Sequence, residues 1–244
     1  LLDCDGRTWH CSNDGHAMTR APDLRKPAAG VFRAYARKVL KSAAEDLNSA
    51  LNGGSVHAAR RSLKQLRSLL RLIRPAIGKA AARTADARLK AAADRLAGAR
   101  RAEALKTAVL RLGLDAGLTE RLQAAVTAHC GADRTPQKLA DAIAGAVAEI
   151  AALRVEAGRW HLPKSGHRLY VEGVRACYAR ARRALRASLA SRDAGQLHEA
   201  RKWVIHNLHH MEQLRRLWPE LMTVWASELT VLREALGDFN DLAE

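Results

Sequence analysis

The sequence predicts an all-α protein, and three observations carry this prediction. Apolar residues make up 48% of the 244 residues and aromatic residues only 4%, a balance rich in Ala and Leu that is typical of helices packed on helices. Apolar residues recur with a helical period along most of the chain. Gly and Pro residues, Pro75 and Gly237 among them, fall at the expected helix boundaries.

Helical segments follow one another from Val31 onward. Their expected bounds are about 31–51, 55–74, 79–98, 101–112, 118–129, 136–157, 166–190, 196–218 and 220–236. Residues 1–30 show no helical periodicity and contain several helix breakers, so we expect them to form a poorly ordered tail or linker. The remaining residues 31–244 are expected to form the folded part of the chain.

The chain also repeats itself at long range. Three segments recur at offsets of 143, 141 and 140: Tyr35-Ala36-Arg37 as Tyr178-Ala179-Arg180, His57-x-x-Arg60-Arg61 as His198-x-x-Arg201-Lys202, and Leu96-Ala97-Gly98 as Leu236-Gly237-Asp238. Colinear matches at one spacing predict two homologous helical units, at about 31–160 and 165–244. Only a handful of residues follow Leu236, so the second unit is expected to lack its last helices.

The charge balance indicates an acidic partner. Lys and Arg number 41 against 25 acids, and a net charge of +16 attracts polyanions in a salt-sensitive way. Four scattered cysteines are too few for a disulfide framework, so a cytoplasmic location is expected. No run of residues approaches the roughly 20 apolar residues that a membrane span needs, so no membrane partner is expected.

The segment 56–75, VHAARRSLKQLRSLLRLIRP, carries six Arg or Lys residues and no acid. On a helical wheel its leucines lie on one side and its cations within an arc of about 120° on the other. These cationic positions are His57, Arg60, Arg61, Lys64, Arg67 and Arg71. Like charges on one helix face repel, so the compensating anion is expected from outside the segment.

Further cationic stripes lie on three other expected helices. They consist of Arg33, Arg37 and Lys41; of Arg168, Arg175, Arg182 and Arg186; and of His198, Arg201, Lys202, His209 and Arg216, the last interrupted by Ile205 and Glu212. One such stripe alone is most often a solvated surface. Four of them in a two-fold repeat are expected to meet around a shared basic groove or pore between the two units, where the missing anion is a ligand.

The segments VHAARRSLKQLRSLLRLIRP, GVRACYARARRALRASLASRDAGQLHEARKWVIHNLHH and LGDFNDLA resemble the signature segments of the CHAD family. The similarity runs from about Val31 to the C-terminus. The resemblance implies two four-helix units around a basic central pore that binds inorganic polyphosphate, with polyphosphate granules as one expected place of association. Ile205 departs from the family pattern, where a Lys is usual, and Arg101 stands where an Asp is frequent.

By this resemblance, thirteen residues map to pore-lining positions: Arg33, Arg37, His57, Arg60, Arg61, Lys64, Arg67, Arg175, Arg182, Arg183, His198, Arg201 and Lys202. Arg71 and His209 join them from the helical wheel alone. A bound phosphate would favour the imidazolium form of His57 and His198, so binding is expected to tighten as the pH falls through the histidine range.

Two other functions remain open. Non-specific nucleic-acid binding follows from the net charge, although the few aromatic residues read as core or helix ends rather than as stacking platforms. A metal site is the other alternative, because His206 and His210 have i,i+4 spacing, but the sequence HNLHH lacks the Glu of HExxH. No catalytic motif stands out, so we expect neither an enzyme nor a cofactor.

Overall fold

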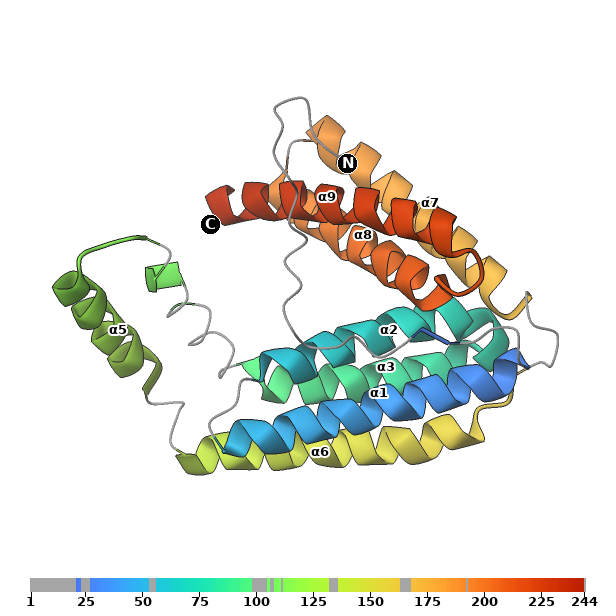
Figure 1. Cartoon of the computed structure of the whole chain (residues 1–244), viewed down its shortest axis with the longest axis horizontal. Helices are drawn as coiled ribbons and strands as arrows, with labels where there is room; N and C mark the ends of the chain where they lie inside the picture. Colours follow the sequence, from blue (N-terminus) through green and yellow to red (C-terminus); the bar gives the residue numbers. More distant parts are fainter. Residues whose placement is uncertain are drawn as a thin grey trace.

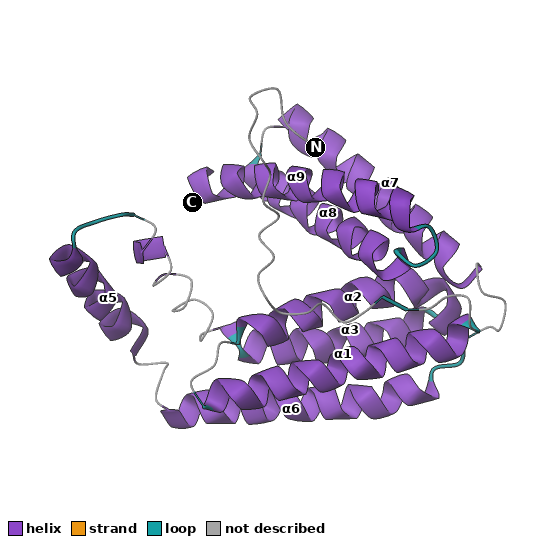
Figure 2. Ribbon diagram, in the orientation of Figure 1, coloured by secondary structure: helices purple, strands orange, loops and turns teal. Residues whose placement is uncertain are grey.

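The computed structural model describes residues 21–22, 27–52, 56–97, 105, 108–110, 112–131, 136–162, 168–191 and 193–243. Every regular element in these residues is an α-helix, which confirms the all-α prediction (Figure 2). The expected tail and most of the expected helix at 101–112 lie outside the described residues. The first helix begins at Ala28, three residues before the expected start.

Four helices form the first bundle: α1 (Ala28–Leu51), α2 (His57–Ile77), α3 (Lys79–Arg95) and α6 (Pro136–Arg159). Helices α2 and α6 each pack against both α1 and α3 (Figure 1). The core between them is aliphatic, with Phe32, Leu66, Leu89 and Ile150 almost fully buried. The leucine face of α2 points into this core, as its helical period predicts.

Helix α2 does not end at Pro75, where the sequence predicted a boundary. Proline lacks the N–H that a helix interior requires, but only Ala76 and Ile77 follow it, so it disturbs no more than the last turn. The helix ends instead at Gly78, whose φ of 86° lies in the left-handed region that glycine tolerates. The N–H of Gly78 donates to the carbonyl of Arg74 over 3.0 Å.

Three helices form the second layer: α7 (Arg168–Ser191), α8 (Ala194–Leu214) and α9 (Pro219–Ala243). Helix α8 packs against both neighbours, and Asp193 caps its start by accepting a hydrogen bond from the N–H of Gln196 over 2.8 Å. The boundary predicted at Gly237 is wrong, because α9 continues through it. Gly237 is buried beneath Arg201, whose Nη2 would lie 2.9 Å from an added Cβ atom.

The two layers meet along α2, which packs against α7 and α8. The approach to α7 is close enough that a Cβ atom at Gly173 would overlap the carbonyl of Leu72. Helix α5 (Ala116–Gly131) lies to one side of both layers (Figure 1). None of the described helices is both long enough and apolar enough to cross a membrane.

Candidate functional site

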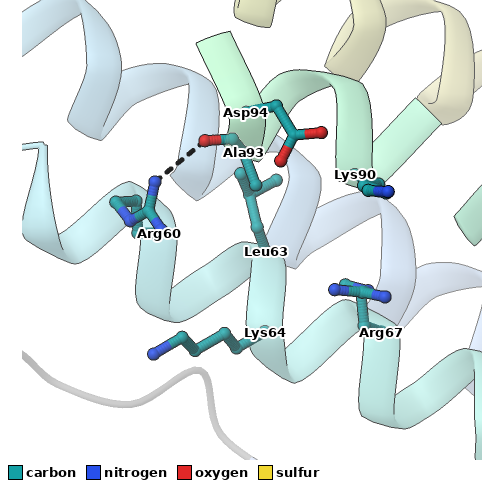
Figure 3. Close-up of a pocket in the computed structure, with 7 residues that line it drawn as sticks. All are labelled: Arg60, Leu63, Lys64, Arg67, Lys90, Ala93 and Asp94. Carbon is teal, nitrogen blue, oxygen red and sulfur yellow. Dashed lines mark hydrogen bonds between the residues drawn. The ribbon is translucent and has the colours of Figure 1, made fainter. Parts of the chain in front are cut away.

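A basic depression lies between α2 and α3, with a volume of about 300 Å³ (Figure 3). Its lining residues are Arg60, Leu63, Lys64, Arg67, Lys90, Ala93 and Asp94. Four of these seven residues are cations and one is an acid. The helical period of α2 explains the arrangement, because positions 60, 64 and 67 lie on one face of the helix. Leu63 lies at the edge of that face and is buried in the core.

Contacts with α3 hold two of the arginines in the depression. Arg60 Nη1 donates to the carbonyl of Ala93 over 2.8 Å (Figure 3). Arg67 donates two hydrogen bonds to the carboxylate of Asp86, over 2.8 and 3.2 Å. Burial alone would raise the pKa of Asp86, but the hydrogen bonds and charge of Arg67 and the nearby Arg71 outweigh it and hold this pKa below its usual value. Arg67 is therefore partly neutralised by the protein.

A second helical layer brings further positive charge to the same region. The pKa of His209 on α8 is lowered mainly by burial and then by the neighbouring His210. The charges of Lys64 on α2 and Arg233 on α9 lower it further. Lys64 and Arg233 therefore approach one α8 side chain from separate layers. The backbone of Arg233 is held by Arg201, whose Nε donates to the Arg233 carbonyl over 3.4 Å.

Glu212 lies one turn beyond His209, largely buried, and its Oε2 has no hydrogen-bond partner among the described residues. Burial raises the pKa of this carboxyl to about 7, although the charges of Arg233, Arg215 and Arg61 oppose the rise. The carboxyl is thus an internal acid near cations of α2 and α9 and near Arg215, the residue that follows α8. It also contributes to the raised pKa of Tyr35 on α1, whose main cause is burial.

The histidines of HNLHH lie in the contact between α2 and α8. Ser68 Oγ lies 2.7 Å from Nδ1 of His206 and 2.9 Å from Nδ1 of His209, and Nε2 of His210 lies 2.8 Å from the Ser68 carbonyl. Burial, together with neighbouring positive groups, lowers their pKa values to about 2, 3 and 4 in chain order. The described residues contain no group of three or more potential metal ligands.

Arg71 and Arg180 both stack on Trp203, from α2 and α7, with their guanidinium carbons 5.5 and 4.9 Å from the ring centroid. Trp203 Nε1 donates to Glu199 over 3.1 Å. Burial is the main cause of the lowered pKa of Arg71, which Asp86 opposes. Arg71 therefore contacts protein groups at the junction of α2, α7 and α8.

Residues 30–244 match the family model of the CHAD domain. The chain belongs to the CHAD domain family. Searches of curated proteins and of solved structures found no match to the chain. The family match covers both helical layers and the junction between them.

The CHAD domain brings together only part of the predicted set. Arg60, Lys64 and Arg67 share the depression. The charge of Arg61 acts on Glu212 of α8, and Arg201 donates to the backbone carbonyl of Arg233. His57 at the start of α2 and His198 in the second turn of α8 are exposed at the surface. Lys202 is exposed too and pairs with Glu199 over 3.1 Å.

Other predicted residues lie elsewhere on the CHAD domain. Arg33 donates to the carbonyl of Trp160 over 3.0 Å and so ties α1 to the end of α6, and Arg37 is exposed on α1. His209 is buried rather than open to a ligand. Arg175, Arg182 and Arg183 are exposed, and their helical positions point away from Gly173, Cys177 and Ala181, which face α2 and α8.

Sequence reasoning missed three cations: Lys90, which lines the depression, and Arg215 and Arg233, whose charges act on Glu212. They lie on segments with mixed charge, so no stripe marks them. The repeat offered a signal for Arg233. The repeat matches Arg60 with Arg201. Arg60 donates to the carbonyl of Ala93 and Arg201 to the carbonyl of Arg233. Ala93 and Arg233 are 140 positions apart, so they are matched by the repeat as well.

Proposed function

We propose that this CHAD domain binds inorganic polyphosphate along the basic groove where α2 and α3 face α8 and α9, without turning it over. One observation carries the proposal: four cations, Arg60, Lys64, Arg67 and Lys90, line one depression between α2 and α3. A groove lined by one sign of charge concentrates counter-ions.

The chemistry of these cations suits a chain of identical phosphates. Arg donates paired hydrogen bonds to phosphate oxygens, and Lys supplies a point charge on a flexible stem. Lys64 is exposed and reaches out from α2 (Figure 3), while Arg60 is fixed by the Ala93 carbonyl. Repeated cations along a track bind a linear polyanion without reading any sequence.

We further propose that residues 31–160 and 165–244 form two homologous units related by an approximate two-fold axis. Matching arginine-to-carbonyl hydrogen bonds in the two layers support this, from Arg60 to Ala93 and from Arg201 to Arg233. In this arrangement α2 and α8 are equivalent helices that cross at the axis. The groove is then the space on one side of that crossing.

Competition binding tests the function. Labelled polyphosphate bound to the protein at moderate salt is challenged with unlabelled polyphosphate, duplex DNA and heparin at equal charge. We expect polyphosphate to displace the label at a lower concentration than either competitor. Displacement by DNA at the same charge concentration would favour the non-specific nucleic-acid reading instead.

Charge-removing variants locate the site. Lys64→Ala and Arg233→Ala should each weaken binding about three- to tenfold and reduce the salt dependence, because each removes one phosphate contact. Arg182→Ala is the matched control, since it removes one positive charge from the exposed outer face of α7. Equal losses in all three variants would mean that net charge alone drives binding, and unchanged binding in the first two would remove the groove from the site.

A further inference from the structure

Arg67 of α2 lines the depression with one edge of its guanidinium already in use. Its Nε and Nη2 donate to the two oxygens of Asp86 on α3 over 2.8 and 3.2 Å, the paired geometry in which a guanidinium holds a carboxylate. A guanidinium holds phosphate oxygens through the same kind of N–H pair. Asp86 therefore occupies the edge of Arg67 that a bound phosphate would use.

The contact of Arg60 with α3 is of another kind. Arg60 Nη1 donates one hydrogen bond to the backbone carbonyl of Ala93, and a carbonyl has no net charge with which to offset the guanidinium. This contact positions Arg60 without neutralising it. A phosphate that takes the paired edge of Arg67 must first displace a carboxylate, and no such step follows from the contact between Arg60 and Ala93.

Asp86 keeps a positive neighbour when Arg67 leaves it. Nη1 of Arg71, one turn further along α2, lies 3.6 Å from Oδ1 of Asp86. Burial raises the pKa of Asp86, but the two arginines outweigh this effect, Arg67 more than Arg71. Displacement of Arg67 therefore leaves the carboxylate beside a second guanidinium rather than alone, which limits the free-energy cost of the displacement.

Arg71 is held in place by groups other than Asp86. Its Nη1 donates to the carbonyl of Arg67 over 3.0 Å, and its guanidinium carbon lies 5.5 Å from the centroid of the Trp203 ring on α8. Arg67 lines the depression, and Arg71 is not among the lining residues. The carboxylate of Asp86 thus has one fixed partner and one partner that a ligand in the depression can reach.

We infer that Asp86 is an internal competitor of the bound polyanion: a phosphate group takes Arg67 from Asp86, and the carboxylate then pairs with Arg71. Asp86 thereby sets the affinity of the depression below the value that its four cations would give. The inference rests on the proposed function for the site and for the class of ligand, a polyanion, but it does not depend on polyphosphate in particular.

A double-mutant cycle tests the competition. Asp86→Asn keeps the shape of the side chain and releases Arg67, so it should tighten the binding of labelled polyphosphate about two- to fivefold, the range of a partly exposed ion pair. Binding is measured by fluorescence anisotropy at constant salt. In an Arg67→Gln background the same substitution should lose most of this effect, because no arginine is left to release.

Asp94→Asn is the matched control. Asp94 also lies on α3 and lines the depression (Figure 3), but it makes no ion pair with any residue that the structure describes. Removing its charge should raise the affinity by the same factor in the wild type and in the Arg67→Gln background, because its charge acts on the ligand directly. A urea unfolding curve checks that each variant folds.

Arg71→Gln tests the second partner of Asp86. Asp86 then has Arg67 as its remaining arginine partner, so polyphosphate binding should weaken about two- to fivefold. Asp86→Asn should cancel most of this loss. Arg74→Gln is the control for the lost charge, because Arg74 is exposed near the end of the same helix. It should weaken binding less than Arg71→Gln does, and by the same factor with or without Asp86→Asn.

Three outcomes would overturn the inference. They are an affinity that Asp86→Asn does not raise, a gain from Asp86→Asn that is equal in the wild type and in the Arg67→Gln background, and equal effects of Arg71→Gln and Arg74→Gln. The cycle is repeated with labelled heparin. If the wild type binds heparin but not polyphosphate, the proposed function fails, and a gain in heparin binding that depends on Arg67 would still support the competition.

Discussion

Ser68 of α2 and His209 of α8 contact each other across a sequence separation of 141 residues, with Oγ and Nδ1 2.9 Å apart. The same offset relates His57 to His198 in the sequence repeat. A residue on a two-fold axis meets its own equivalent, so this contact is what the proposed arrangement predicts at the crossing of α2 and α8. The crossing is polar and buried, although it joins two aliphatic cores.

Replacing Ser68 should show how much its hydrogen bonds stabilise the contact between α2 and α8. The Ser68 hydroxyl also lies 3.0 Å from the Lys64 carbonyl, which can only accept, so the hydroxyl donates there and accepts Nδ1–H bonds from His206 and His209. Ser68→Ala leaves two buried N–H groups unpaired and should lower the free energy of unfolding by about 2–4 kcal/mol. Urea denaturation at pH 7.5, followed by circular dichroism, measures the loss.

Thr84→Ala is the control for that measurement. Thr84 Oγ1 donates to the Ala80 carbonyl over 3.3 Å on the exposed side of α3. Its removal should change the free energy of unfolding by less than about 0.5 kcal/mol. A Ser68→Ala loss as small as that of the control would contradict the tautomers and bonds described above.

The buried histidines should make the fold sensitive to acid. The pKa values of His206, His209 and His210 are about 2, 3 and 4 in the native protein, far below the unfolded value of about 6.5. As the pH falls from about 6.5 towards 4, the unfolded chain binds protons that the native state does not. Each histidine then costs up to about 1.4 kcal/mol of stability per pH unit.

Glu212 acts in the opposite direction over part of this range. Burial raises its native pKa to about 7 from 4.5, so between these values the native state binds the proton first and gains stability on acidification. The three histidines outweigh the one carboxyl, so the free energy of unfolding still falls between pH 6.5 and 5. Urea unfolding at pH 7.5 and 5.0 should show a fall of several kcal/mol, roughly the sum of these opposing slopes.

The variant His210→Gln isolates one histidine in this comparison. Glutamine does not titrate, yet its amide can donate to the Ser68 carbonyl as Nε2 of His210 does. The loss between pH 7.5 and 5.0 should shrink by about 1–2 kcal/mol. An unchanged loss would mean that His210 does not remain neutral in the native state.

Close packing of α2 on α7 gives a third prediction. A methyl group at Gly173 would overlap the Leu72 carbonyl, so Gly173→Ala should force the two helices apart and cost about 3 kcal/mol despite its better helix propensity. Cys177, one turn further along α7 and only 3% exposed, should react faster with a thiol reagent, with the modified residue identified by mass spectrometry. Gly158→Ala in α6 is the control, because nothing lies within 4 Å of its added Cβ atom.

Gly158→Ala should leave Cys177 protected and stability equal or slightly higher, by up to about 1 kcal/mol. Equal reactivity of Cys177 in both variants would show that the Leu72 contact does not hold the layers together.

The sequence predicted the helices well, because amphipathic periodicity reflects burial in a bundle core. It also predicted the cationic face of α2, of which Arg60, Lys64 and Arg67 share one depression. The sequence could not distinguish polar residues that face solvent from polar residues that face another helix. Gln65 and Ser68 are polar and only 6% and 0% exposed, since they face α8 rather than water.

The same limit explains the histidines and the tryptophans. A stripe records which residues share a helix face and not what packs there, so buried His209 and exposed Arg175 looked alike in the sequence. Trp225 was one of the tryptophans that the sequence placed in the core or at helix ends, and it is 37% exposed on α9. The position of one helix layer on another depends on contacts such as that of Gly173 with Leu72, which no local pattern records.

Glu212 should make polyphosphate binding depend on pH. Its carboxyl faces Arg61 of α2, Arg215 at the end of α8 and Arg233 of α9, with Tyr35 of α1 nearby and His209 on its own helix. Because its pKa is about 7, it is mostly neutral at pH 6 and mostly ionised at pH 8. An ionised carboxylate offsets these cations and repels a bound polyanion, so wild-type affinity should fall about three- to tenfold between pH 6 and 8.

The variant Glu212→Gln removes the titrating group and keeps the shape of the side chain. It should bind polyphosphate more tightly than the wild type at pH 8 and about equally at pH 6, with affinities measured at constant ionic strength. His57→Gln combined with His198→Gln serves as the comparison, because surface histidines that charge on a phosphate would give a slope of the same sign. If the double variant flattens the profile and Glu212→Gln leaves it steep, the pH dependence arises at the surface histidines and the Glu212 carboxyl has no part in the site.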